Sequence, residues 1–259
     1  MLIVISPAKD QDPVPIRIKG TTLPRDLDRS EILMEKLKRM RPAALAKLMG
    51  ISGTLAELNH ERNQLWSTAH PPGKTTPALF LFKGEVYRGL KAASLDPGAL
   101  AHAGHHLRIL SGLYGMLRPL DRVHPHRLEM GTKLSVGRRY KDLYAFWGEA
   151  IPARLMEDLA GSGSDHLVDL ASNEYSKALG KLPMHVRLVR PVFQDRTPSG
   201  YRSLMTYAKH QRGAMARFAL EHRLTDPEGL KHYQGDGYRY SQKDSDATQW
   251  VFKRDKRAS

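Results

Sequence analysis

Short runs of apolar residues recur along this chain and alternate with stretches of helical spacing. A five-residue run at 2–6 ends at Pro7, and similar runs follow at 107–113 and 166–170. Such short apolar runs, bounded by turn residues, are typical of buried strands. Their interleaving with helices predicts a mixed α/β architecture. We expect a single domain over residues 1–259, with a mixed sheet, flanking helices and an inserted helical unit at about 38–66.

The remaining elements follow from the same patterns. Strands are also expected at 78–82, 186–189, 191–194, 202–207, 238–240 and 249–252. Helical spacing predicts helices at 26–40, 43–49, 54–66, 141–159 and 208–222. Pro42 suits the first turn of the second helix, and Pro152 should kink or split the fourth.

The chain is strongly basic, with 41 Lys and Arg residues against 27 Asp and Glu, and a formal net charge of +14. The excess is concentrated in two stretches, 108–141 and 187–223, each with only two acidic residues. Tyr, Leu, Gly and Pro residues separate these cations, so we expect the two stretches to be folded structure and not a disordered tail. A folded surface this positive attracts a polyanion or a phosphate-bearing ligand. A host with generally basic proteins is the alternative explanation.

Two absences narrow the function. The chain has no cysteine, which excludes disulfides, thiolate metal sites and cysteine nucleophiles. No apolar stretch approaches the roughly 20 residues of a membrane-spanning helix. We therefore expect a soluble, cytoplasmic protein that does not associate with membranes. We also expect a monomer, although neither absence bears on oligomeric state.

A helical hairpin is predicted around Gly50. Leu45, Leu48 and Ile51 are apolar, two glycines bracket the turn at 50–53, and Leu55 and Leu58 continue the apolar face. This pattern resembles a helix-hairpin-helix, a unit that holds DNA phosphates through backbone amides without reading bases. Ser52 stands where a second hairpin glycine is usual, and Lys47 is the nearest cation. An ordinary glycine-capped hairpin remains the alternative.

Two further segments are candidate phosphate-binding elements. Residues 110–131 combine a glycine-rich turn with Arg118 and Arg127, whose guanidinium groups could clamp a phosphate or carboxylate. In the helix at 208–222, 100° spacing places Lys209, Arg212 and Arg217 on one side. The alternatives are glycines that only turn the chain and an ordinary solvated helix face.

Two weaker motifs bear on catalysis and metal binding. His124 and His126, with His105, His106 and Glu129, suggest a metal site, but their spacing matches no zinc pattern, so we predict neither a metal nor a cofactor. Ser6 and Lys9 form a Ser-x-x-Lys pair, which some acyl enzymes use as nucleophile and base. An anion contact by Lys9 at a strand end is the simpler use.

The chain carries motifs at 1–9, 82–87, 110–121, 127–131, 141–147, 170–175 and 212–218, in order along nearly its whole length. Through these motifs it resembles the YaaA peroxide-stress family. It implies an α/β domain with a helix-hairpin-helix unit and a basic cleft. It further implies binding of double-stranded DNA with little sequence preference, and a cytoplasmic role in limiting free iron and DNA damage under hydrogen peroxide. Transferred to this chain, the DNA-binding residues are Lys47, Gly50, Ser52, Gly53 and Thr54 in the hairpin, and Lys9, Lys83, Arg108, Arg118, Arg127, Lys209, Arg212 and Arg217 in the cleft.

Two functions remain open at this point. The first is a nonenzymatic DNA-binding protein of the peroxide response, and no reaction follows from the resemblance. The second is an enzyme that acts on a nucleotide or another phosphorylated small molecule. In that case Arg118, Arg127 and Lys209 would hold the phosphate, and Ser6, Lys9 or Glu129 would carry the chemistry.

Overall fold

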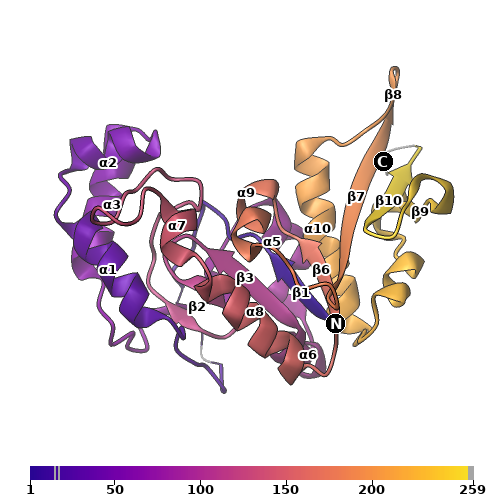
Figure 1. Ribbon diagram of the computed structural model, residues 1–259, viewed down its shortest axis with the longest axis horizontal. Coiled ribbons are helices and arrows are strands. Elements are labelled where there is room, and N and C mark those ends of the chain that lie inside the picture. The colour runs from indigo at the N-terminus through magenta and orange to yellow at the C-terminus, as the bar shows by residue number, and fades with distance from the viewer. Residues whose placement is uncertain (15, 17, 256–259) are drawn as a thin grey trace.

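A computed structural model describes residues 1–14, 16 and 18–255. Its main feature is an eight-stranded sheet in the order β4-β3-β1-β6-β7-β10-β9, with β8 paired to the outer end of β7 (Figure 1). The strands are β1 (Leu2–Ile5), β3 (Leu107–Ser111), β4 (Gly115–Leu117), β6 (His166–Leu170), β7 (Arg187–Thr197), β8 (Gly200–Arg202), β9 (Arg239–Tyr240) and β10 (Gln249–Arg254). Strands β3, β1, β6, β7 and β10 run parallel. A separate ribbon pairs β2 (Thr76–Pro77) with β5 (Arg122–Val123).

Helices cover both faces of this sheet. They are α1 (Leu27–Lys38), α2 (Pro42–Met49), α3 (Gly53–Leu65), α4 (Ala78–Leu81), α5 (Glu85–Leu90), α6 (Pro97–His106), α7 (Leu143–Trp147), α8 (Ala150–Gly161), α9 (Asn173–Ser176) and α10 (Met205–Glu221). Short 3₁₀ turns lie at Ala92–Ser94, Lys177–Leu179, Pro227–His232, Gly235–Gly237 and Gln242–Asp244. In Figure 1, α8 and α9 lie in front of the sheet, α10 lies behind it, and α1, α2 and α3 form a unit at the edge far from β10. This arrangement confirms the predicted mixed α/β fold.

The strand order reverses at the centre of the sheet. Ile5 of β1 pairs with Ile109 of β3 on one side and with Leu170 of β6 on the other. Strands β1 and β6 are neighbours in the sheet. The next strand after β1 in this sheet, β3, lies on one side of the pair, and the next strand after β6, β7, lies on the other side, so the two connections run in opposite directions. In open α/β sheets, ligands bind in the crevice at such a reversal, outside the carboxyl ends of the strands. We therefore expect a ligand site at the segments that follow Ile5 and Leu170.

Helix α10 is held close to the sheet by its contact with α5. A side chain at Gly213 would overlap the carbonyl oxygen of Val86, and one at Gly89 would overlap that of His210. Because both positions lack a side chain, the two helix backbones touch. This contact fixes the position of Arg212, the residue before Gly213, relative to the end of β1.

Several predicted elements are correct and several are wrong. The runs at 2–6, 107–113 and 166–170 are β1, β3 and β6, and 238–240 and 249–252 close the sheet as β9 and β10. The run at 78–82 is a helical turn, α4, and not a strand, because periodicity cannot separate the two in so short a run. The segment 202–207 is not a strand either: β8 ends at Arg202, and α10 already begins at Met205.

Two prolines lie where their missing amide costs little. The predicted strands at 186–189 and 191–194 are one strand, β7. Its pairing with β6 ends at Val189, and the amide of Arg190 points to β10, so Pro191 faces a side with no ladder partner. The predicted helix 141–159 is split at Gly148 and not at Pro152, because Pro152 lies in the first turn of α8.

The apolar face expected for α3 is also wrong. Leu55 and Leu58 are each 40% exposed and Leu65 is 76% exposed, whereas Asn59 and Asn63 are buried. The Ser52 hydroxyl accepts a hydrogen bond from the Leu55 amide, which fixes where α3 begins after the turn. The helix therefore packs on its neighbours through Ala56 and the two asparagines.

Candidate functional site

The predicted hairpin is formed by α2 and α3. Gly50 ends α2 in the left-handed conformation, with φ 61° and ψ 46°, and Ser52 begins the next helix as an extended cap. The amides of Gly53 and Thr54 open α3, where intrahelical partners are lacking. Both residues are exposed, and across the part of the chain that the structure describes neither amide has a partner. The turn thus presents two free backbone donors at a positive helix end.

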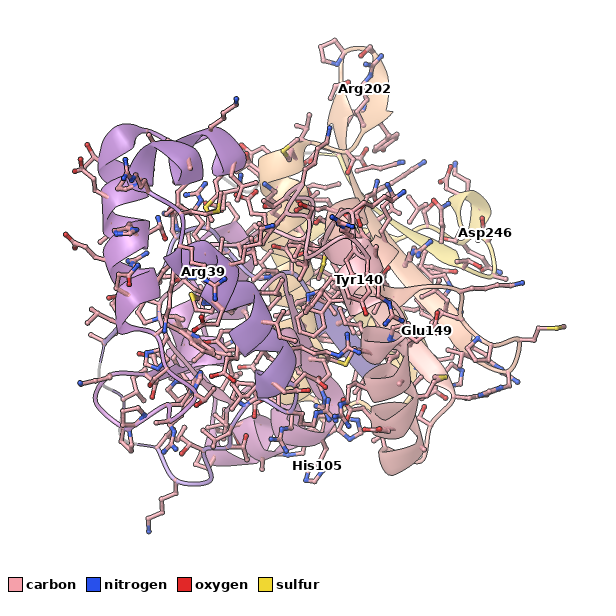
Figure 2. The ribbon with its side chains drawn as sticks, turned by 60° about the vertical axis from the view of Figure 1, so that its left-hand side comes forward. Arg39, His105, Tyr140, Glu149, Arg202 and Asp246 are labelled. Atoms are coloured by element: carbon pink, nitrogen blue, oxygen red, sulfur yellow. The ribbon has the colours of Figure 1, made fainter. Side chains whose placement is uncertain are left out.

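Exposed cations lie on the helical unit that carries this turn and on the loop packed against that unit. Arg41 and Lys47 come from α2 and its start, and Lys133, Arg138 and Lys141 come from the loop at 131–141. Among the described residues these five cations have no ion-pair partner. Lys47 and Lys133 line one hollow, and Arg39 and Gly137 line a second, so the loop lies against the ends of α1 and α2. Figure 2 labels Arg39, directly after α1, and Tyr140 near the end of the loop. We call the amides of Gly53 and Thr54, together with these five cations, the hairpin face.

A second group of polar residues lies at the carboxyl ends of β1 and β6. The Ser172 amide donates to the Ser6 hydroxyl oxygen at 2.8 Å, and the two hydroxyls are 3.3 Å apart. The Tyr87 hydroxyl donates to the Ser6 carbonyl oxygen at 3.1 Å. Burial, and then the neighbouring Tyr175, raise the pKa of the Tyr87 hydroxyl, so it stays protonated. These hydrogen bonds of Ser6 join the ends of β1 and β6, and they form the floor of the crevice at the point where the strand order reverses.

Charged side chains surround this floor. The Lys9 Nζ atom lies 2.8 Å from one oxygen of Glu129, and Arg127 Nη2 lies 3.4 Å from the other. Glu174 accepts a hydrogen bond from the Gly131 amide at 2.7 Å. The structure thus brings together Lys9, Arg127 and Glu129, which the sequence singled out. We call Ser6, Lys9, Arg127, Glu129, Ser172 and Glu174 the strand-end site.

Glu129 and Glu174 also line a hollow of about 730 Å³ between this site and α2. Its opposite wall consists of Met40, Leu48 and Met49. The sequence motif at 170–175 contains Ser172 and Glu174, but sequence reasoning did not assign them a role. A serine within two residues of the end of each of two buried strands, at positions 6 and 172, was the signal that could have done so.

Arg212 occupies an unusual position on α10. It lies on the stripe of Ala208, Met215 and Ala219, all buried, and is itself half-buried. Burial lowers the pKa of Arg212, and the field of Asp169 opposes that shift. Both Asp169 oxygens accept hydrogen bonds from other groups. Within the described residues, the Arg212 guanidinium makes neither a hydrogen bond nor an ion pair.

Three predicted cleft cations are bonded inside the fold. Arg108 is 5% exposed and donates to Asp158 at 2.6 Å. Arg118 is bonded to Asp121 and to the Leu23 carbonyl oxygen. Arg108 and Arg118 lie at the amino end of β3, away from the strand-end site, as the register of Ile109 with Leu117 shows. These two cations do not share one surface with the strand ends.

The third internally bonded cation is Arg217. Its guanidinium donates to the carbonyl oxygens of Leu90 and Lys91, which end α5, and to Glu221. Lys83 is half-exposed and pairs with Asp12 at 3.1 Å, and Lys209 is exposed near the start of α10. The cations of the two cation-rich stretches therefore do not gather on one surface: some lie at the amino ends of the strands and others at the carboxyl ends.

The histidines form a structural cluster. His124 and His126 are buried with His70 around the Tyr114 hydroxyl, which accepts a hydrogen bond from Trp66 at 2.7 Å. Burial lowers the pKa of both His124 and His126 to about 4. His105 and His106 lie elsewhere, at the end of α6. Across residues 1–14, 16 and 18–255, no three His, Cys, Asp or Glu side chains are grouped as metal ligands.

Comparisons with known proteins agree over the whole chain. Residues 1–244 match the family model described as peroxide stress protein YaaA. A UPF0246 protein of Ralstonia nicotianae is 47% identical over 255 residues, which cover 98% of this chain and 99% of the relative. UPF0246 proteins of Neisseria meningitidis serogroup B and Hahella chejuensis are 43% and 45% identical, and each match covers 98% of this chain and 98% or 100% of the relative. In the described part of the chain, no helix has the length and apolar character needed to cross a bilayer.

Proposed function

The chain belongs to the peroxide stress protein YaaA family, and we propose that it binds double-stranded DNA with little sequence preference through the hairpin face. In this proposal the protein acts in the cytoplasm during peroxide stress, where it limits free iron and oxidative DNA damage. Family membership supports the link to peroxide. The geometry of the hairpin supports the mode of binding.

The observation that carries the proposal is the pairing of free amides with free cations. Gly53 and Thr54 direct two backbone donors outward at the positive end of α3, which suits a phosphate oxygen. The left-handed Gly50 makes this possible, because it turns the chain so that α3 starts immediately after α2. Such contacts position a protein on the DNA backbone without reading its bases.

The five cations of the hairpin face extend the contact along the duplex. Lys47 and Lys133 line the same hollow, and neither is bonded to an acidic residue among those described. Cations that are free of internal partners can release counterions from DNA when they bind phosphates. The expected result is an affinity that depends on salt and hardly on sequence.

Exchange of one backbone amide tests the proposal. Gly53→Pro removes the Gly53 N–H group, whereas proline is well tolerated at the first position of a helix. Ser52 already has the extended conformation that precedes proline, with φ −63° and ψ 159°. We expect the variant to fold normally and to bind duplex DNA about tenfold more weakly or worse, since a hydrogen bond to a charged group is lost.

Gly53→Ala is the matched control, because it keeps the amide and its side chain meets no atom within 4 Å. Fluorescence anisotropy with a labelled duplex compares the three proteins. Equal affinities of the proline and alanine variants would refute the hairpin contact. In cells exposed to hydrogen peroxide, the alanine allele should protect DNA and the proline allele should not.

A further inference from the structure

The crevice at the strand-order reversal continues into the hollow beside α2. Glu129 belongs to both, since it pairs with Lys9 at 2.8 Å and also lines the hollow. A volume of about 730 Å³ is typical of a small-molecule site. A duplex is on the order of 20 Å wide and would not enter a space of this size. The hairpin contact proposed above leaves this hollow without a role.

The two walls of the hollow have different chemistry. Met40, Leu48 and Met49 form an apolar wall on the helical unit, against which a flat ring could pack. Glu129 and Glu174 face them with carboxylate oxygens, which accept hydrogen bonds from hydroxyl or amino groups. A ligand that fits both walls has an aromatic ring and a hydroxylated part, as a nucleoside does.

Cations with unused donors lie at the strand end. The Arg127 Nε atom is buried and has no partner, and Lys9 and Arg127 share the single carboxylate of Glu129. Guanidinium groups match the oxygens of a phosphate in pairs. An anion bound here would satisfy Arg127 and would lie next to the hollow.

Arg212 adds a further free guanidinium on the same side. His210, two residues before Arg212, lies 3.7 Å from Glu85, and the adjacent Gly84 packs against Ala8, so this part of α10 lies close to the segment that follows β1. The Arg212 side chain lies on the other side of α10, on the buried stripe of Ala208 and Met215, where the field of Asp169 near the end of β6 acts on it. A buried cation without a partner is costly, and a bound anion removes that cost.

We propose that the strand-end site and the adjoining hollow bind a free mononucleotide. Arg127, Lys9 and Arg212 hold its phosphate, and the hollow between α2 and the carboxylates of Glu129 and Glu174 holds its nucleoside. This inference does not rest on the proposed DNA binding, because the amides and most cations of the hairpin face lie outside the hollow.

Calorimetry and thermal unfolding with AMP, adenosine and inorganic phosphate test the proposal on the full chain. AMP should bind and raise the melting temperature at micromolar to millimolar concentrations. Adenosine and phosphate should each bind at least tenfold more weakly, since each fills only one part of the site. If millimolar AMP, GMP, CMP and UMP all leave the melting temperature unchanged, the proposal is overturned.

Arg212→Gln and Arg127→Gln should each weaken AMP binding at least tenfold. Arg223→Gln is the matched control, because Arg223 is exposed and pairs with Asp96 at 3.3 Å. Without ligand, Arg212→Gln should melt no lower than the parent protein, since it removes an unpaired, half-buried charge. A lower melting temperature with unchanged AMP affinity would assign Arg212 a purely structural role and overturn its part in the site.

Two further measurements separate this site from DNA binding. Arg138→Glu should weaken duplex binding and leave AMP affinity unchanged, since Arg138 does not line the hollow. Saturating duplex should leave AMP bound. Displacement of AMP by duplex would assign the site to a nucleotide of the DNA itself and overturn the assignment to a free ligand.

Discussion

Salt dependence gives the most quantitative test of the hairpin face. Its cations with neither an ion pair nor a ring contact number five among the described residues: Arg41, Lys47, Lys133, Arg138 and Lys141. Arg139 of the same loop is left out because its guanidinium lies over the Tyr140 ring. If each neutralises one phosphate, the slope of log K against log salt is about −0.9 × 5, or roughly −4.5. Between 50 and 200 mM KCl the affinity for a duplex should then fall about 500-fold. Anisotropy titrations of a labelled 20-base-pair duplex at four salt concentrations would measure this slope.

A neutral variant tests whether the slope arises from these cations. Lys47→Gln removes one phosphate contact, so the slope should flatten to roughly −3.6 and the fall over the same range to about 150-fold. Arg223→Gln serves as control and should keep the parent slope, because Arg223 already pairs with Asp96. A parent slope flatter than about −2, or equal changes in both variants, would refute the five-cation footprint.

Three further predictions concern stability. Burial holds the pKa of His124 and His126 at about 4, so the unfolded chain takes up protons first as the pH falls below about 6.5. The free energy of unfolding should therefore decline from pH 6.5 to 4, by at most about 3 kcal/mol per histidine, and urea midpoints that are constant over this range would contradict it. Gly213→Ala should destabilise by roughly 1–3 kcal/mol in urea titrations, whereas Gly104→Ala, with open space around it, should be neutral or slightly stabilising; equal effects would contradict the helix contact. Arg108→Ala should cost roughly 3 kcal/mol because it breaks a buried ion pair, yet leave the anisotropy signal with DNA unchanged.

The sheet could be predicted from the sequence where burial dominates. Residues 2–6, 107–113 and 166–170 are mostly apolar because β1, β3 and β6 are covered on both faces, and few other structures require such runs. The run at 78–82 has the same character but forms the turn α4, since burial alone does not select between strand and helix. Local spacing also failed for α3, where the turn at Ser52, and not the leucines, sets which side is buried.

The site was predictable only in part, because a sequence does not show which charges are already paired. Lys9, Arg127 and Glu129 were candidates. They meet because Lys9 follows β1, while the loop that carries Arg127 and Glu129 packs on Gly112 at the carboxyl end of the neighbouring strand β3. Arg108 and Arg217 were equally good candidates in the sequence. In the structure Arg108 donates to Asp158, and Arg217 donates to the Leu90 carbonyl oxygen at the end of α5. Their partners are distant along the chain, so no local pattern reveals the pairing.

The same distinction indicates how a net charge of +14 would serve the two ligands proposed above. Cations that pair with acids inside the fold contribute stability and little external field, as Arg108 does with Asp158. Those of the hairpin face have no acidic partner in the described chain, so their field extends into solvent and suits a long polyanion. Arg127 and Arg212 differ from both groups, because each is partly buried and retains unused donors. Water cannot fully solvate such groups, so they favour a small anion that enters the crevice over a duplex that remains outside it.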